Sequence, residues 1–153
     1  MRLENQDLRN QKYIVEVVND MKVFIGGSKT ILELDSETKS VLDSLCAENA
    51  YILVGDCFGA DKLVQQYLNN KGYKNVTVYV SGDKTRNNIG GFNEKHIKAN
   101  GLTGFEYYRQ NDIAMAKDAD CGLMLWDGKT KGTACNIRDM REMGKEVLVI
   151  RYD

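Results

Sequence analysis

The stretch that decides the fold is residues 21–29, which read MKVFIGGSK. The apolar run at 23–25 is typical of a buried strand, and the two glycines at 26–27 end that strand. Helical spacing of apolar side chains begins soon afterwards, from about Ser36. A strand, a glycine-bearing loop and a helix in this order predict the first unit of a parallel α/β sheet.

The same alternation of strand and helix runs through the rest of the chain. Strand patterns occupy 51–54, 76–80, 121–126 and 147–150, and helical patterns occupy 60–71, 105–117 and 133–143. Continuous apolar strands need burial on both faces, which is the situation of a parallel sheet between two layers of helices. The sequence therefore predicts the α/β class, as a single Rossmann-like three-layer domain with a mostly parallel five-stranded sheet.

We assign this domain to residues 21–153 and interpret residues 1–20 as an N-terminal extension with weak helical spacing. The polar stretch 81–103 is long for a connection inside a compact domain. Loops of this length usually serve a function, so we interpret it as a rim or lid of a site.

Composition and charge restrict the partners. The 153 residues are 42% hydrophobic, which suffices for one core, and 21 Lys and Arg balance 22 Asp and Glu. Without surplus positive charge, nucleic acid is a disfavoured partner. The polar N-terminus and the lack of any apolar run near ~20 residues predict a cytoplasmic protein with no membrane partner. Four scattered cysteines and one histidine predict reduced thiols and no metal site.

Four loops follow predicted strands and share residues suited to an anionic ligand. In a parallel sheet the carboxyl ends of the strands meet at one edge, and ligands bind there. Glycine lets backbone amides approach a phosphate, and helix N-termini direct free N–H groups at it. The candidate ligand-binding residues in these loops are Gly26, Gly27, Ser28, Lys29, Gly55, Asp56, Gly59, Ala60, Asp61, Arg86, Asn87, Asn88, Asp127, Gly128, Lys131, Gly132 and Thr133.

Several of these residues have an equally ordinary interpretation. Each glycine loop taken alone is also typical of a simple turn. Asp56 and Asp61 suit either helix capping or acceptance of hydrogen bonds from a ribose or a base. The segment 86–88 suits either a grip on phosphate or a solvated turn. Glu106 and Arg109 have the spacing of a helical surface pair.

These motifs resemble the SLOG superfamily, which includes the LOG, DprA and YpsA-like proteins. The residues that carry the resemblance are VFIGGS at 23–28, the loop GDCFGAD at 55–61, and the segments 119–128 and 131–133. Together with RNN at 86–88, the second loop looks closest to the YpsA-like branch. The resemblance covers about residue 21 to the C-terminus, and implies a Rossmann-like sheet, a nucleotide or nucleotide-derived ligand and a homodimer.

The sequence departs from the enzymes of this neighbourhood at one position. Those that cleave N-glycosidic bonds carry a glutamate within one helical turn after the Gly-Thr pair, whereas here Gly132-Thr133 is followed by Ala134, Cys135 and Asn136. An amide does not ionise, so Asn136 is no nucleophile or general base, although it suits a hydrogen bond to a ribose. Asp56, Asp127 and Glu106 are the remaining carboxylate candidates for catalysis.

The leading hypothesis is therefore a domain that binds or senses a nucleotide-derived ligand through its phosphate and ribose, with no separate cofactor. The first alternative is an N-glycosidase, phosphoribohydrolase or deoxyribosyltransferase-like enzyme acting on a nucleoside or nucleoside monophosphate. The second is DprA-like binding of a single-stranded nucleic acid, against which the balanced charge argues.

Overall fold

The computed structural model describes residues 21–153, so the interpretation of 1–20 as a helical extension lies outside the described residues. Six strands and four helices make up this part. Their bounds are β1 Lys22–Gly27, α2 Ser36–Ala47, β2 Tyr51–Gly55, α3 Ala60–Asn70, β3 Val76–Ser81, β4 Asn93–Ile97, α4 Gly104–Asp118, β5 Cys121–Trp126, α5 Lys131–Glu142 and β6 Glu146–Arg151. The α/β class and the strand–helix order predicted from the sequence are confirmed.

The strands form one sheet in the order β4-β3-β2-β1-β5-β6, and every neighbouring pair within residues 21–153 is parallel. The expected five strands are thus corrected to six. The additional strand, β4, lies within the polar stretch 81–103 and pairs with β3 at the edge of the sheet. Four of its five residues are exposed, so burial imposes no apolar pattern that sequence analysis could detect.

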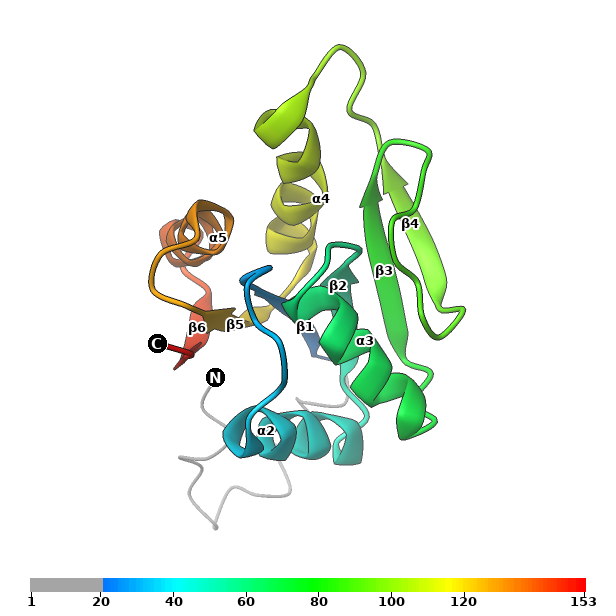
Figure 1. Ribbon diagram of the computed structural model, residues 1–153, viewed down its shortest axis with the longest axis vertical. Helices are drawn as coiled ribbons and strands as arrows, with labels where there is room; N and C mark the ends of the chain where they lie inside the picture. The colour runs from blue at the N-terminus through cyan, green and yellow to red at the C-terminus, as the bar shows by residue number, and fades with distance from the viewer. Residues whose placement is uncertain (1–20) are drawn as a thin grey trace.

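Helices cover both faces of the sheet, as the three-layer prediction requires (Figure 1). Alternate residues of β1 point to opposite sides: Val23 and Ile25 pack in the core cluster that contains α2 and α3 side chains. Phe24 packs in the second cluster, with Met115 of α4 and Met140 of α5. Two separate cores therefore hold the sheet, and α4 and α5 lie next to one another on one face.

The connections change direction at β1. Strands β2, β3 and β4 succeed one another on one side of β1, whereas β5 and β6 lie on its other side. In open parallel sheets the two loops that leave such a point diverge and leave a crevice at the carboxyl ends of the strands. The fold therefore places its natural ligand position between the ends of β1 and β5.

Direct hydrogen bonds hold the loops at this edge together. The amide of Ser28 donates to the carbonyl of Leu125 at 2.8 Å, and the amide of Ala60 donates to the carbonyl of Ser28 at 3.2 Å. Gly59 has a φ of +72°, and a side chain there would contact the backbone of Lys29. Glycine at this position lets the loops after β1 and β2 touch.

Candidate functional site

A cavity of about 470 Å³ opens at the carboxyl ends of β1, β2 and β5, between α4 and the start of α5. Its position is the edge that the topology selects for ligands. Ten of the residues predicted from the sequence line it: Gly26, Gly27, Ser28, Lys29, Asp61, Arg86, Lys131, Gly132, Thr133 and Asn136. The structure therefore brings together residues from four separate segments of the chain, 110 positions apart at the extremes.

Eight of the other predicted residues are absent from the lining: Gly55, Asp56, Gly59, Ala60, Asn87, Asn88, Asp127 and Gly128. Several of them have structural partners instead. Asn88 donates to the carbonyl of Phe92 at 2.9 Å and to Glu94 at 2.8 Å, which closes the turn before β4. Asn87 donates to the carbonyl of Asp56 at 3.0 Å. These residues shape the loops behind the cavity wall.

Asp56 is buried and holds Arg86 in place at the rim. The guanidinium of Arg86 donates to Asp56 Oδ1 from Nη2 at 2.7 Å and from Nε at 3.2 Å, and the Arg86 amide donates to Oδ2 at 2.9 Å. Asp56 is only 1% exposed. Because three donors occupy this carboxylate, its contribution to the site is the orientation of Arg86.

Asp127, a catalytic candidate, closes the loop after β5. It accepts from the amides of Lys129 and Thr130 at 2.8 Å each, and from the hydroxyl of Thr30 at 2.7 Å. The bonds from Thr130 and Thr30 hold the pKa of Asp127 well below its ordinary value. The third candidate, Glu106, lies on the exposed side of α4 and does not line the cavity.

Asp61 brings a buried carboxyl to the cavity. The side chain is 8% exposed, and its Oδ2 accepts from the amide of Cys57 at 3.1 Å. Gly55 makes room for it, since a Cβ there would lie 2.5 Å from Asp61 Oδ2. Burial and the nearby charge of Asp112 raise the pKa of Asp61 well above its ordinary value.

A chain of hydrogen bonds places a second carboxyl, that of Asp112, in the cavity wall. Asn136 Nδ2 donates to Asp112 Oδ2 at 3.1 Å, and Asn136 Oδ1 accepts from Arg109 at 2.8 Å. Arg109 also donates to Asp139 at 2.5 Å. Burial raises the pKa of Asp112 from 3.8 to about 6, against the opposing effects of the Asn136 bond and the Arg109 charge. Asn136 thus holds a carboxylate supplied by another helix.

The same contacts correct the expected surface pair of Glu106 and Arg109. Arg109 is 7% exposed, and its guanidinium points toward α5 to bind Asp139 and Asn136. The reason is tertiary, because α4 packs along α5 and turns this position inward.

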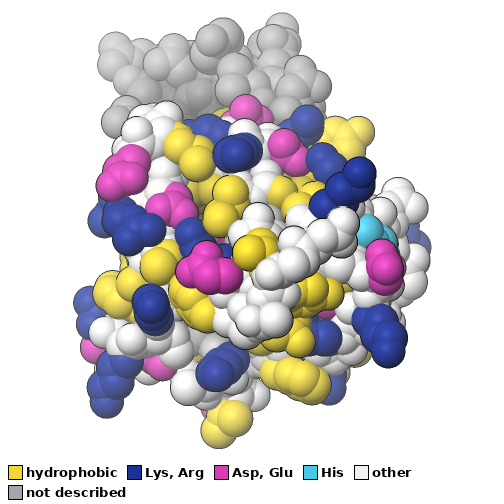
Figure 2. Space-filling view, turned by 90° about the horizontal axis from the view of Figure 1, so that it is seen from above, with side chains coloured by type: hydrophobic (Ala, Val, Ile, Leu, Met, Phe, Trp, Pro, Cys, Tyr) yellow, Lys and Arg dark blue, Asp and Glu magenta, His cyan; other side chains and the backbone are white. Residues whose placement is uncertain are grey.

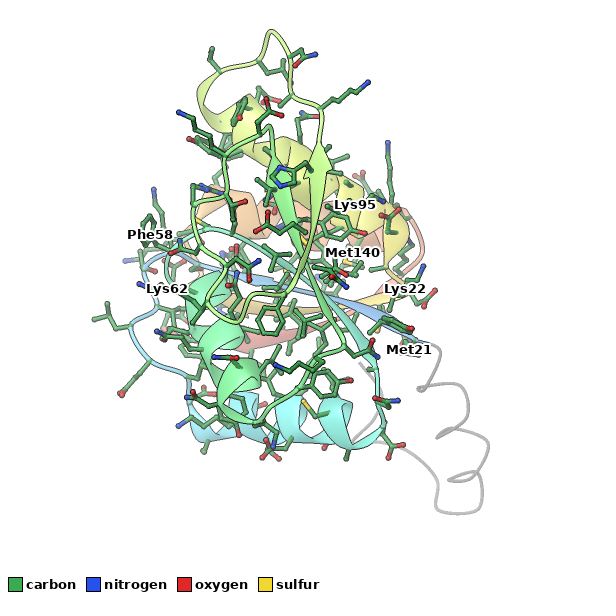
Figure 3. The ribbon with its side chains drawn as sticks, turned by 90° about the vertical axis from the view of Figure 1, so that its right-hand side faces the viewer. Met21, Lys22, Phe58, Lys62, Lys95 and Met140 are labelled. Atoms are coloured by element: carbon green, nitrogen blue, oxygen red, sulfur yellow. The ribbon has the colours of Figure 1, made fainter. Side chains whose placement is uncertain are left out.

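Aromatic side chains line or flank the cavity, and each carries a cation over its ring. Phe105 and Tyr108 of α4 are 41% and 46% exposed, with Lys131 4.6 Å from the first ring centroid and Arg86 4.2 Å from the second. Phe58 lies with Lys62 on the side of the view opposite to Lys22, where β1 begins (Figure 3). Exposed aromatic rings at a cavity suit stacking with a planar ligand group.

Seven lining residues were missed by sequence reasoning, five of them from α4: Cys57, Phe105, Tyr108, Arg109, Asn111, Asp112 and Thr130. A signal was present, because 105, 108, 109 and 112 have the i, i+3, i+4, i+7 spacing of one helical face. Aromatic and charged side chains together on one helical face indicate a face that contacts a ligand or another part of the protein.

The cavity edge next to α5 suits an anion. Thr130, the N-cap of α5, makes no side-chain hydrogen bond to an amide of the first turn. The hydroxyl of Thr130 instead pairs with Ser28 at 2.5 Å. Lys29 and Lys131 are exposed there, and within residues 21–153 neither takes part in any of the ion pairs. Helix amides and the helix dipole at this edge favour an anion, and both lysines line the same cavity, with the Lys131 ammonium 4.6 Å from the Phe105 ring centroid.

The described residues offer neither a metal site nor a membrane-spanning helix. Between 21 and 153 there is no cluster of three or more histidine, cysteine, aspartate or glutamate side chains arranged to hold a metal ion. Over the same range, every helix is too short or too polar to cross a bilayer.

Fold and cavity together define a Rossmann-like α/β domain with a ligand-sized cavity at its switch point. No protein-family model matches the chain, and no curated protein is found to match it. Among solved structures, DNA processing protein A (DprA) from Helicobacter pylori, described for its single-stranded DNA binding mode, is similar, with a TM-score of 0.65 and 13% sequence identity. The match covers 90% of this chain and 69% of that one. At this identity the likeness shows a shared fold, the fold that the SLOG resemblance implies.

Proposed function

We propose that the chain binds a nucleotide-derived ligand, with its phosphate at the start of α5 and its ribose and base toward α4. The phosphate position is supported by the first turn of α5, which has no side-chain cap, and by Lys29 and Lys131, which form no ion pair within residues 21–153. Amides of a helix N-terminus bind a phosphate oxygen without the desolvation cost of a buried cation.

The base and ribose positions rest on size and on the aromatic wall. The volume of about 470 Å³ falls within the usual range of small-molecule sites, about 300–1,000 Å³. Phe105 and Tyr108 offer exposed ring surface on one wall, and Asn111 and Asn136 offer amide groups for hydroxyls or base edges. The single observation that carries the proposal is that these groups and the α5 terminus share one cavity.

Calorimetry tests the proposal. We expect AMP, ADP, a cyclic nucleotide or ADP-ribose to bind with a dissociation constant in the micromolar range. Lys131→Ala should weaken binding about tenfold, whereas Lys129→Ala, an exposed lysine outside the lining, should leave it unchanged. If no compound of the panel binds more tightly than millimolar, the cavity is not a nucleotide site.

A second candidate function is cleavage of an N-glycosidic bond, and the carboxyls of Asp61 and Asp112 favour it. A pKa of about 6 for Asp112 suits a general acid near neutral pH, which gives its proton to the departing base while water attacks the sugar C1′. Chromatography of nucleoside monophosphates incubated with the protein would detect the free base. Loss of that product in Asp112→Asn, but not in the exposed-site control Asp83→Asn, would support the assignment.

Single-stranded DNA is the ligand that the similar structure suggests. The two aromatic rings that line the cavity, those of Phe105 and Tyr108, each have a cation beside them, an arrangement that suits bases and phosphates. Against this, basic side chains are interspersed with acidic and apolar ones on the face in Figure 2, and the chain carries a net charge of −1. We expect no salt-sensitive binding to a labelled oligonucleotide; tight binding at physiological salt would overturn this expectation.

The homodimer and the YpsA-like branch are further predictions of the resemblance. Light scattering of the full chain measures the first directly, and a mass of two chains would support it. A ligand shared with a characterised YpsA-like protein would support the second.

A further inference from the structure

His96, the single histidine of the chain, lies on β4 between two groups that only accept hydrogen bonds. Its Nδ1 is 2.6 Å from the carbonyl oxygen of Gly82, and its Nε2 is 2.9 Å from Oε1 of Glu94. A neutral imidazole carries one N–H and therefore donates to only one of two such oxygens. Both contacts are satisfied together only when the ring is protonated and both nitrogens donate.

Gly82 is itself held from two sides. Its amide donates to the carbonyl of Ile97 on β4 at 2.8 Å, and α4 brings the hydroxyl of Tyr107 so close that a Cβ on Gly82 would overlap it. Gly82 also has a φ of +74°, a conformation that glycine adopts without strain. The carbonyl that faces His96 is therefore fixed by contacts that are independent of the histidine.

The carboxylate of Glu94 connects His96 to the loop that carries Arg86. Thr85 Oγ1 donates to Glu94 Oε1 at 2.8 Å, and Asn88 Nδ2 donates to Oε2 at 2.8 Å. One carboxylate thus binds the loop on both sides of Arg86, a residue that lines the cavity. Hydrogen bonds from Asn88, His96 and Thr85 hold the pKa of Glu94 below its ordinary value, so its oxygens remain acceptors.

We infer that protonated His96 forms a pH-sensitive clasp with Gly82 and Glu94, which fastens the 82–92 loop to β4 and so holds Arg86 at the cavity rim. When the ring loses its proton, it keeps an N–H for only one of the two oxygens, and a nitrogen lone pair faces the other. Arg86 remains bound to Asp56, so the loop loosens without detaching.

The groups around His96 favour its protonated form. Hydrogen bonds to the Gly82 carbonyl and to Glu94, with the charges of Glu94 and Asp83, raise the pKa of His96 above 6.5. The clasp therefore contributes fully below pH 6.5, the pKa of an unfolded chain, and is lost as the pH rises through the higher value of the fold. The side chains of His96 and Glu94 are 36% and 28% exposed, so water screens the pair and the expected effects are severalfold.

Proton NMR of the full chain, free of any histidine tag, tests the clasp directly because His96 gives the only imidazole signals. Its pKa should lie above 6.5 in the wild type. Glu94→Gln should lower that pKa by about half a pH unit or more. Glu142→Gln, an exposed site on α5, which packs against β5 and β6, should leave it unchanged. A wild-type pKa of 6.5 or below, or one that Glu94→Gln does not lower, overturns the inference.

Hydrogen exchange measures whether the clasp reaches the loop. The amides of Arg86 and Phe92 donate to side chains within the described part of the chain, so both are measurably protected. In the wild type their protection factors should fall severalfold between pH 6 and pH 8. In His96→Gln, whose side chain does not ionise, they should already be severalfold lower at pH 6 and should not change with pH. Equal protection in the two proteins at pH 6 contradicts the clasp.

The effect of the clasp on ligand affinity rests on the proposed function. Adenosine 3′,5′-cyclic monophosphate keeps one negative charge from pH 6 to pH 8, so its own ionisation does not enter. By calorimetry it should bind the wild type severalfold more tightly than His96→Gln at pH 6, and the difference should shrink at pH 8. No difference at pH 6 overturns the coupling and leaves the proposed function intact. If no nucleotide binds, the proposed function fails, while NMR and exchange still decide the clasp.

Discussion

Replacing Asp112 by asparagine should make the protein more stable at neutral pH. The Asp112 carboxyl has a pKa of 3.8 in an unfolded chain and about 6 in the fold, because burial disfavours its ionised form. Between these values the folded state binds more protons than the unfolded state, so this side chain's contribution to stability falls as the pH rises through about 6. Asparagine has no charge to bury and still offers an oxygen to Asn136.

The size of the effect follows from linkage. Ionising Asp112 in the fold costs at most about 3 kcal/mol at pH 7.5 and about 1 kcal/mol at pH 4.5. Because the side chain is only half-buried, water at the cavity lowers these figures. We therefore expect Asp112→Asn to gain about 1–3 kcal/mol at pH 7.5 and less than about 1 kcal/mol at pH 4.5.

Urea unfolding at the two pH values measures this gain, with the fluorescence of Trp126, the single tryptophan, as the signal. Asp83→Asn, at an exposed site, should change the free energy of unfolding by less than about 0.5 kcal/mol at either pH. A loss of stability in Asp112→Asn at pH 7.5, or a gain that does not depend on pH, would refute the reasoning. The first result would mean that the fold stabilises the charged form of Asp112, and the second would mean that the gain does not come from its ionisation.

Three other substitutions test the walls of the cavity. Gly55→Ala places a methyl group 2.5 Å from Asp61 Oδ2, so it should cost about 1–3 kcal/mol in urea unfolding, and an unchanged midpoint would show that the carboxyl moves freely. Asp56→Ala leaves the half-buried Arg86 without its partner and should cost about 3–5 kcal/mol, with faster hydrogen exchange of the 82–92 loop; protection equal to wild type would contradict the anchoring role. Gly59→Ala puts a side chain at a φ of +72° and against the neighbouring backbone, so thermal unfolding should detect a loss above about 1 kcal/mol, and no loss would exclude a tight contact between the loops.

The order of strands and helices was predictable because buried segments have apolar sequences. Strands such as β1 and β5 are buried on both faces and therefore read as continuous apolar runs. The edge strand β4 is exposed along most of its length, and its pairing with β3 depends on backbone hydrogen bonds that any residue type can make. Its existence was therefore not predictable from apolar patterning.

The candidate site was also predictable only in part from the sequence. Loops after parallel strands meet at one edge by topology, so the sequence alone predicts that residues such as Ser28 and Lys131 share a site, and both line the cavity. Which side chain of a loop faces the cavity depends on contacts between distant segments. Asp56 and Asp61 are five residues apart, at the two ends of the connection from β2 into α3, yet Asp56 binds Arg86 whereas Asp61 lines the cavity.

For the glycine-loop edge, the sequence by itself determined the class of fold, the edge of the sheet that carries the site and the absence of a carboxylate at position 136. These are properties of local pattern and of composition. Only the tertiary structure decided that α4 places the carboxyl of Asp112 beside Asn136. Asn136 donates a hydrogen bond to Asp112 and accepts one from Arg109. The physical reason is that the contacts of a helix face depend on the element packed against it, and α4 and α5 meet only when the chain is folded.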